Sequence, residues 1–314
     1  MTWSRRFRII GSCLLPLLMG IVACGGDSED TAGASASRIA FVSDRDGHRR
    51  IYVMNADGSG QRAVSDPAYG SDTWPTWSPD GARIAFVSDE NGRDDIYVID
   101  ADGGNRRNIT NTPDSGDWSP SWSPGGTRIA FTSDREPAGL YVMDSDGGNP
   151  AHLLADAWSP AWSPDGLQIV VYVTGRRNDD SSMSVIDADG GVRWVVEDGG
   201  VAGGRPAWSP DNAWIAATAA NDSEPLARMH DWRSIVLMDV FGRNRRVVTH
   251  NRRGTDRSPT WSPDARHIAY EAHDDMLMGD SHYRSDIHVL NLDDMSMRRL
   301  TNSRDYDAMP AWSR

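Results

Sequence analysis

Short apolar segments alternate with turn-forming residues along the chain from Arg38 onwards. A typical unit contains the runs Ile84 to Val87, Ile96 to Ile99 and Arg107 to Ile109. These runs are rich in β-branched and aromatic residues and are bounded by Gly, Pro, Asn and Asp, which is typical of β-strands. Residues 38–314 show no sustained helical periodicity, so the pattern predicts an all-β fold.

A Trp-Ser pair, with proline two residues before the tryptophan, marks a further strand in each unit. The repeated tryptophans are Trp77, Trp122, Trp162, Trp208, Trp261 and Trp312. Most are followed by Ser-Pro-Asp-Gly or a close variant, which favours a tight turn into the next strand. Four antiparallel strands in each of six units predict a six-bladed β-propeller.

The two ends of the repeat predict how the ring closes. The first unit begins at its second strand, and the sequence ends on a lone Trp-Ser strand at Trp312. We therefore expect the C-terminal strand to complete the first blade and cover two open sheet edges. The simplest role for the repeated tryptophans is to fill the space between neighbouring blades.

The consensus Pro-x-Trp-Ser-Pro-Asp-Gly, then Ile-Ala-Phe, then Ile-Tyr-Val-Met-Asp-Ala-Asp-Gly-Gly resembles the repeat of the TolB family. This WD-repeat-like module occurs in the periplasmic TolB protein and in many bacterial lipoproteins. The resemblance covers residues 38–314 and implies a propeller that acts at the cell envelope. Oligogalacturonate lyases also resemble this repeat, and they use metal-bound histidines in the propeller mouth.

The N-terminal segment predicts export and lipidation. Residues 1–23 have a basic start and an apolar centre, as in a signal peptide. Ile21-Val22-Ala23-Cys24 resembles the lipobox of bacterial lipoproteins, which implies a lipid on Cys24; an ordinary secretory signal is the alternative. Residues 24–37 are small and polar and predict a flexible tether before the propeller at 38–314. We expect a membrane-anchored protein that faces the periplasm or the cell exterior.

Composition narrows the chemistry. The net charge of −13 argues against nucleic acid as a partner. The sequence has no lysine, and its two cysteines lie in the signal peptide and at the lipidation site. Lysine and cysteine nucleophiles are therefore absent from the predicted propeller. We expect no cofactor and a monomer.

Strand order defines two faces of the predicted ring. The turn face carries the short Ser-Pro-Asp-Gly and Asp-Ala-Asp-Gly-Gly turns. The mouth face carries the loops between second and third strands and the connections between blades. Its loops are longest at 219–233 and 272–285, and variable loops on a rigid ring usually carry function. Candidate binding residues in these loops are His230, Trp232, His273, Met276, His282 and Tyr283.

Four aspartates add to the predicted mouth site. Each stands five residues before a repeated tryptophan: Asp72, Asp117, Asp256 and Asp307. Each leads into an innermost strand, so we expect the four to surround the channel mouth and attract cations or a basic peptide.

These observations predict a non-enzymatic, lipid-anchored binding or scaffold protein that engages an envelope protein, peptide or glycan at the channel mouth. The alternative is a metal-dependent polysaccharide lyase of the oligogalacturonate type. In that alternative, His230, His273 and His282 would hold the metal.

Overall fold

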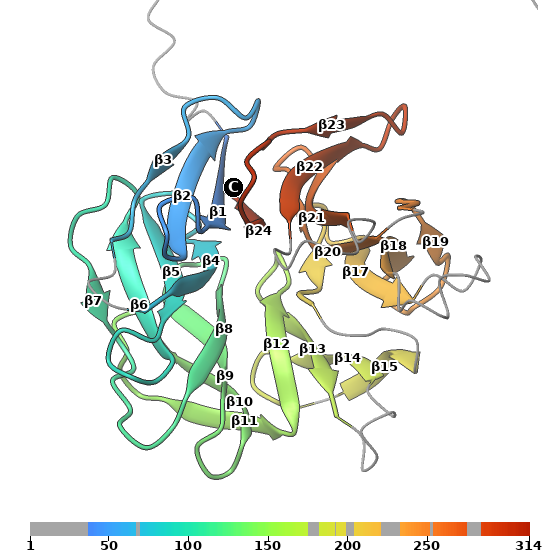
Figure 1. Ribbon diagram of the computed structural model, residues 1–314. Coiled ribbons are helices and arrows are strands. Elements are labelled where there is room, and N and C mark those ends of the chain that lie inside the picture. The colour runs from blue at the N-terminus through green and yellow to red at the C-terminus, as the bar shows by residue number, and fades with distance from the viewer. Residues whose placement is uncertain are drawn as a thin grey trace, which may run out of the picture. The chain divides into compact units, whose positions relative to one another are not determined.

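The computed structural model describes residues 37–66, 70–174, 182–191, 193–198, 204–220, 233–251, 254–274 and 284–314. All of them belong to one compact unit, Ala36–Arg314. Six four-stranded antiparallel sheets surround a central axis, and Figure 1 shows them as the blades of a propeller. This arrangement confirms the fold that the sequence predicts.

The first three blades contain twelve strands. Blade 1 contains β24 (Asp307–Trp312), β1 (Arg38–Ser43), β2 (Arg50–Asn55) and β3 (Arg62–Ala63). Blade 2 contains β4 (Asp72–Trp77), β5 (Arg83–Ser88), β6 (Asp95–Asp100) and β7 (Arg107–Asn108). Blade 3 contains β8 (Asp117–Trp122), β9 (Arg128–Ser133), β10 (Gly139–Asp144) and β11 (Ala151–Ala155).

The remaining blades repeat the order. Blade 4 contains β12 (Ala157–Trp162), β13 (Gln168–Val173), β14 (Ser182–Asp187) and β15 (Arg193–Asp198). Blade 5 contains β16 (Ala207–Trp208), β17 (Trp214–Ala220), β18 (Arg233–Asp239) and β19 (Arg246–Val247). Blade 6 contains β20 (Gly254–Trp261), β21 (His267–Asp274), β22 (Ser285–Asn291) and β23 (Met297–Arg299).

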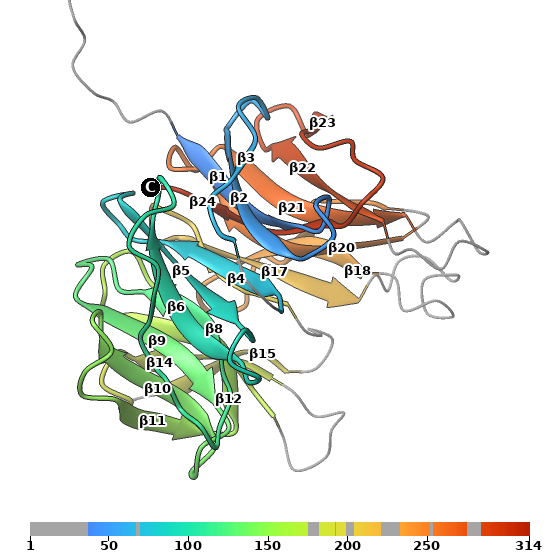
Figure 2. The ribbon, with the colours of Figure 1, turned by 60° about the vertical axis from the view of Figure 1, so that its left-hand side comes forward.

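Blade 1 closes the ring with strands from both ends of the repeat. Ile39 pairs with Trp312 and Ser43 pairs with Asp307, with a register shift between these pairs. The backbone N–H of Arg38 also donates to Ser313 Oγ at 2.8 Å. Figure 2 shows β1 and β24 side by side in a view turned by 60°. The predicted closure is confirmed.

The hydrophobic core consists of six clusters, one at each boundary between neighbouring blades. The cluster between blades 1 and 2, for example, joins Val42 and Ile51 of one blade to Ile84, Phe86 and Trp77 of the next. A repeated tryptophan belongs to every cluster. Five of the six are buried, so their predicted role between blades is confirmed.

The innermost strands share a bulge that shapes the channel. In five of them, the residue three positions before the repeated tryptophan has a positive φ. These residues are Trp74, Ser119, Ser159, Ser258 and Met309. In each strand the register with its neighbour shifts at this point. The equivalent position in blade 5 is Arg205, just before the short β16.

The predicted signal peptide and Cys24 lie outside the described residues. Within the described part of the chain, no helix is long and apolar enough to cross a membrane.

Candidate functional site

The turn face is built from one repeated geometry. In each Ser-Pro turn between the first two strands, a backbone N–H closes the turn on the serine carbonyl, as from Gly81 to Ser78 at 2.9 Å. The Ser78 hydroxyl then bonds the Asp80 carboxylate, and that hydrogen bond lowers the pKa of Asp80. Asp165, Asp211 and Asp264 accept the same bond in their turns. These aspartates are therefore occupied in holding turns, as the sequence predicts.

The mouth face contains the four predicted aspartates, but three of them are not free charges. Each stands at or near the start of an innermost strand, and all four side chains are buried. An arginine pairs with three of them: Arg106 with Asp72 at 2.8 Å, Arg135 with Asp117 at 2.7 Å and Arg45 with Asp307 at 3.0 Å. The expected set of open carboxylates is thus corrected for these three, because a buried carboxylate is stable when paired.

The guanidinium that binds the aspartate does not come from the same strand connection in every blade. Arg45 and Arg135 follow β1 and β9, two residues after the strand ends. The equivalent residue in blade 2 is Glu90, and there Arg106, from the turn before β7, binds both Asp72 and Glu90. The blade 1 counterpart of Arg106 is Gln61, which accepts a 2.7 Å bond from Arg45. The arginine therefore occupies one of these two positions in blade 1 and the other in blade 2.

The fourth aspartate, Asp256 in blade 6, has no arginine partner among the described residues. Its carboxylate accepts a 3.2 Å hydrogen bond from Asn251 Nδ2, which also donates to the carbonyl of His273. Burial raises the pKa of Asp256 to about 6. This carboxyl group therefore titrates near neutral pH, unlike an ordinary surface aspartate.

The boundary between blades 6 and 1 carries a distinct polar group, which we call the 6–1 rim: Arg49, Arg257, His273 and Tyr306. Beneath it lies the buried carboxylate of Glu271. Glu271 bonds the His273 imidazole and accepts the backbone N–H of Met309 at 3.2 Å. The Arg49 guanidinium stacks over the Tyr306 ring at 5.0 Å, and burial raises the pKa of Tyr306. Arg49 and Arg257 are exposed, so the rim offers cations and an aromatic edge to a partner.

The other predicted mouth residues fall outside the described part of the chain: His230, Trp232, Met276, His282 and Tyr283. Their roles stay predictions. Of the three histidines in the lyase alternative, only His273 is placed, and Glu271 holds its ring. The residues that the structure describes contain no cluster of three or more His, Cys, Asp or Glu side chains arranged for a metal.

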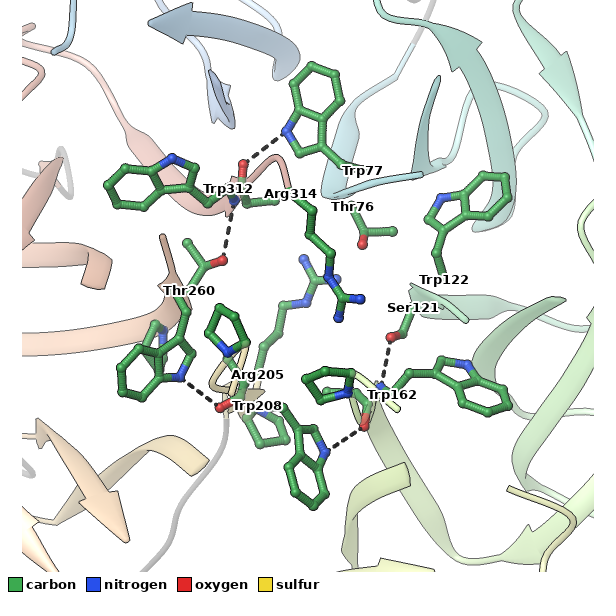
Figure 3. A pocket seen from close by; sticks show the side chains of 18 of the residues that line it. Thr76, Trp77, Ser121, Trp122, Trp162, Arg205, Trp208, Thr260, Trp312 and Arg314 are labelled. Atoms are coloured by element: carbon green, nitrogen blue, oxygen red, sulfur yellow. Dashed lines mark hydrogen bonds between the residues drawn. The ribbon is translucent and has the colours of Figure 1, made fainter. Parts of the chain in front are cut away.

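The central channel contains a cavity of about 390 Å³. Tryptophans and prolines of the innermost strands and of the Ser-Pro turns line it, together with the hydroxyl groups of Thr76, Ser121 and Thr260. Figure 3 shows the guanidinium groups of Arg205 and Arg314 projecting into its middle. Arg205 crosses the channel from blade 5 and donates to the carbonyls of Pro75 at 2.8 Å and Pro120 at 2.9 Å.

Sequence reasoning did not single out these two arginines, although the repeat contains the signal. Arg205 occupies the position at which the other units have Trp, Ser or Met. Arg314 stands two residues after Trp312, where each of the other five units has proline. A residue that breaks a sixfold pattern at an axial position is a candidate for function rather than for the shared fold.

Comparison with known proteins places these features in context. Three overlapping segments, residues 33–131, 59–155 and 136–276, match the TolB beta propeller domain. The crystal structure of TolB from Acinetobacter baumannii is 20% identical with a TM-score of 0.69, and the match covers 90% of this chain and 67% of that chain. A structure described as TolB from Agrobacterium tumefaciens is 20% identical with a TM-score of 0.60, covering 87% and 90%.

An enzyme is also among the similar structures. Oligogalacturonate lyase from Vibrio parahaemolyticus is 14% identical with a TM-score of 0.55, and the match covers 84% of this chain and 74% of that chain. At such identities the likeness concerns the fold.

Proposed function

Because this chain belongs to the TolB β-propeller family, we propose that it is an exported, lipid-anchored binding or scaffold protein. It engages an envelope protein or peptide at the mouth face of the ring. A glycan is the other partner class that the sequence analysis leaves open. The chain works without catalysis, as a rigid ring that presents differentiated side chains at one end.

The observation that carries this proposal is the contrast between the two faces. The Ser-Pro turns repeat one hydrogen-bond geometry from blade to blade. At the mouth, by contrast, Asp117 and Asp307 take an arginine from the loop after the second strand, Asp72 takes Arg106 from the turn before the fourth strand, and Asp256 takes Asn251. A purely structural role would need only the same contacts in every blade. The differences between the blades at the mouth therefore support a role in binding a partner.

The 6–1 rim supplies the described contact surface for that partner. Exposed cations above a buried glutamate favour an acidic or aromatic segment of the partner, and rim charges mainly affect the association rate. The buried aspartates contribute by fixing the positions of Arg45, Arg106 and Arg135 at the same end of the ring.

The test starts with the full chain in its own envelope, cross-linked and recovered with its bound partner. Replacing Arg49 and Arg257 by alanine should slow association with that partner and weaken its salt dependence. Arg243→Ala is the matched control, because Arg243 is an exposed guanidinium 5.8 Å from an aromatic ring, Phe241, on the turn face. If Arg243→Ala weakens binding and the rim variant does not, the partner uses the turn face.

The lipid anchor has a separate test. Cys24→Ser removes the thiol that would carry the lipid, so the protein should move from the detergent phase to the aqueous phase or stay unprocessed. Intact mass of the mature protein measures the modification directly. An unmodified mature chain that begins at another residue would refute the anchor and leave the propeller unaffected.

The lyase is a second candidate, supported by the likeness to the Vibrio parahaemolyticus enzyme. It requires a metal at His273 with ligands from outside the described residues. Metal analysis of the purified protein, together with formation of unsaturated products from polygalacturonate, distinguishes this candidate from the binding protein.

A further inference from the structure

The described lining of the channel cavity offers hydrogen-bond donors and no acidic side chain. None of the lining residues that the structure describes is aspartate or glutamate, although the protein as a whole carries a net charge of −13. Two arginine side chains nevertheless project into this space (Figure 3). Two cations in a confined, partly apolar space repel each other unless an anion lies between them.

Neither arginine takes part in an ion pair within the described part of the protein. The hydrogen bonds of Arg205 use two carbonyl oxygens and hence two of the five N–H donors of its guanidinium. No carboxylate of the described residues forms an ion pair with Arg205 or Arg314. Burial lowers the pKa of Arg205 to about 10 and also lowers that of Arg314. Both groups are still cationic at neutral pH, and Arg205 still has N–H donors to offer.

The wall adds further donors. Ser121 Oγ and Thr260 Oγ1 each accept a backbone N–H, from Trp162 and Trp312 at 3.2 Å, so their hydroxyl hydrogens are left to donate. The indole N–H groups of Trp122 and Trp162 have no hydrogen-bond partner, but they are buried between the blades and do not add donors to the cavity.

The indole groups differ around the ring in a regular way. Trp77, Trp208 and Trp261 donate to the carbonyls of Ala311, Ala161 and Ala207 in the preceding blade at 3.0–3.1 Å. Trp122 and Trp162 instead follow blades that have Thr76 and Ser121 at this position. The hydroxyl groups of Thr76 and Ser121 therefore lie on the side of blades 2 and 3, whereas that of Thr260 belongs to blade 6.

We propose that this cavity is a binding site for a carboxylate, held between Arg205 and Arg314. The planar guanidinium matches the geometry of a carboxylate, and tryptophan and proline walls suit the carbon skeleton that carries it. A volume of about 390 Å³ accommodates a small organic acid or the last residues of a peptide with its terminal carboxylate. The site is separate from the 6–1 rim and does not depend on the function proposed for that rim.

The test is calorimetric titration of the full chain in detergent micelles with three probes at low salt. The probes are trialanine with a free carboxylate, trialanine amide and succinate. We expect a carboxylate probe to bind and the amide to bind at least about tenfold more weakly, because a charge-assisted hydrogen bond is lost. A peptide that binds more tightly than succinate identifies a chain terminus as the ligand, whereas the reverse identifies a small organic acid.

Variants assign the binding to the two arginines. Arg205→Gln and Arg314→Gln should each weaken carboxylate binding at least about tenfold. Arg128→Gln is the matched control, because Arg128 stacks over Trp162 at 4.9 Å but does not line the cavity. If Arg205→Gln lowers the melting temperature, Arg314→Gln decides, since Arg314 makes no hydrogen bond to a described side chain.

Three results would overturn the site. They are equal binding of the acid and the amide, no binding of either carboxylate probe, and carboxylate binding unchanged in Arg314→Gln. Binding of inorganic phosphate without either carboxylate probe would also overturn it, because the cavity would then recognise a different anion. The rim variant Arg49→Ala should leave carboxylate binding unchanged, so failure of this site and failure of the rim are distinguishable.

Discussion

At the scale of single residues, the ring treats its buried carboxylates in two ways. Asp72, Asp117 and Asp307 have arginine partners, so their burial is compensated by charge. Among the described residues, the hydrogen-bond partners of Asp256 are neutral, and burial has the largest effect on its pKa. The first group stabilises the ring as ion pairs, whereas ionised Asp256 costs stability at neutral pH.

Asp256→Asn should therefore stabilise the protein in a pH-dependent manner. The pKa of this group is about 6 in the folded state and about 3.9 in an unfolded chain. Below pH 4 the carboxyl is protonated in both states; as pH rises to 6, the unfolded state loses its proton first and folding becomes less favourable. The variant should gain on the order of 2 kcal/mol over the parent above pH 7 and little at pH 4. Thermal unfolding at both pH values measures this, and a gain independent of pH would contradict the burial of the charge.

At the scale of elements, the six blades share one sheet architecture but carry different side chains at equivalent positions. Blade 1 places Arg45 and Gln61 where blade 2 places Glu90 and Arg106, and in both blades a guanidinium reaches the aspartate. In blade 4 the aspartate is replaced by Ala157 and the residue equivalent to Arg45 is Gly175. Blade 6, by contrast, keeps Asp256 without an arginine partner among the described residues, so the aspartate does not always occur with a cation.

Moving the arginine from position 106 to position 90 in blade 2 tests whether either position can supply the cation for Asp72. Arg106→Gln alone leaves Asp72 and Glu90 without their cation and should cost about 2–3 kcal/mol of unfolding free energy. Addition of Glu90→Arg recreates the blade 1 arrangement and should restore most of that loss. Urea denaturation of the parent, the single variants and the double variant gives the coupling energy. Additive single effects would show that the two positions act independently.

The sequence predicted the elements well and the side-chain pairing poorly. Strands and turns follow from local patterns, such as the apolar run Ile84–Val87, which repeats six times with small changes, and the turn at Ser78, which repeats five times. The partner of Asp72 could not be predicted from such a pattern. Arg106 lies 34 residues from Asp72 in sequence, and it stands at a different position in its blade from the one that Arg45 has in blade 1. Pairing across a blade depends on three-dimensional register, which one repeat does not reveal.

At the scale of the whole molecule, ring closure was predictable and the contents of the channel were not. The lone Trp-Ser strand at Trp312 indicated that β24 joins blade 1, and it does. Arg205 and Arg314 are far apart in sequence and meet only because the ring brings blades 5 and 1 to one axis. An axial site is assembled from several blades, so no single repeat contains its pattern.

Deletion of residues 308–314 should destabilise the entire ring. It removes most of β24, with the backbone hydrogen bonds to β1 and the contacts of Ala308, Ala311 and Trp312. We expect a loss of at least about 3 kcal/mol, a large part of the stability of an ordinary domain. Differential scanning calorimetry measures the change. An unchanged melting temperature would show that β24 is not needed to close the ring.

The pairing of β1 with β24 has a consequence for how copies of this chain meet while they fold. The contacts in blades 2 to 6 are local in sequence, whereas Arg38 and Ser313 are separated by 275 positions. Local contacts form early and such distant ones late, so an incomplete blade 1 presents the open edge of β1 for part of the folding time. In a concentrated refolding mixture, β24 of one copy can occupy that edge in another, which yields a strand-exchanged dimer. Slow dilution from denaturant favours the closed monomer, because the intramolecular strand then has the higher effective concentration.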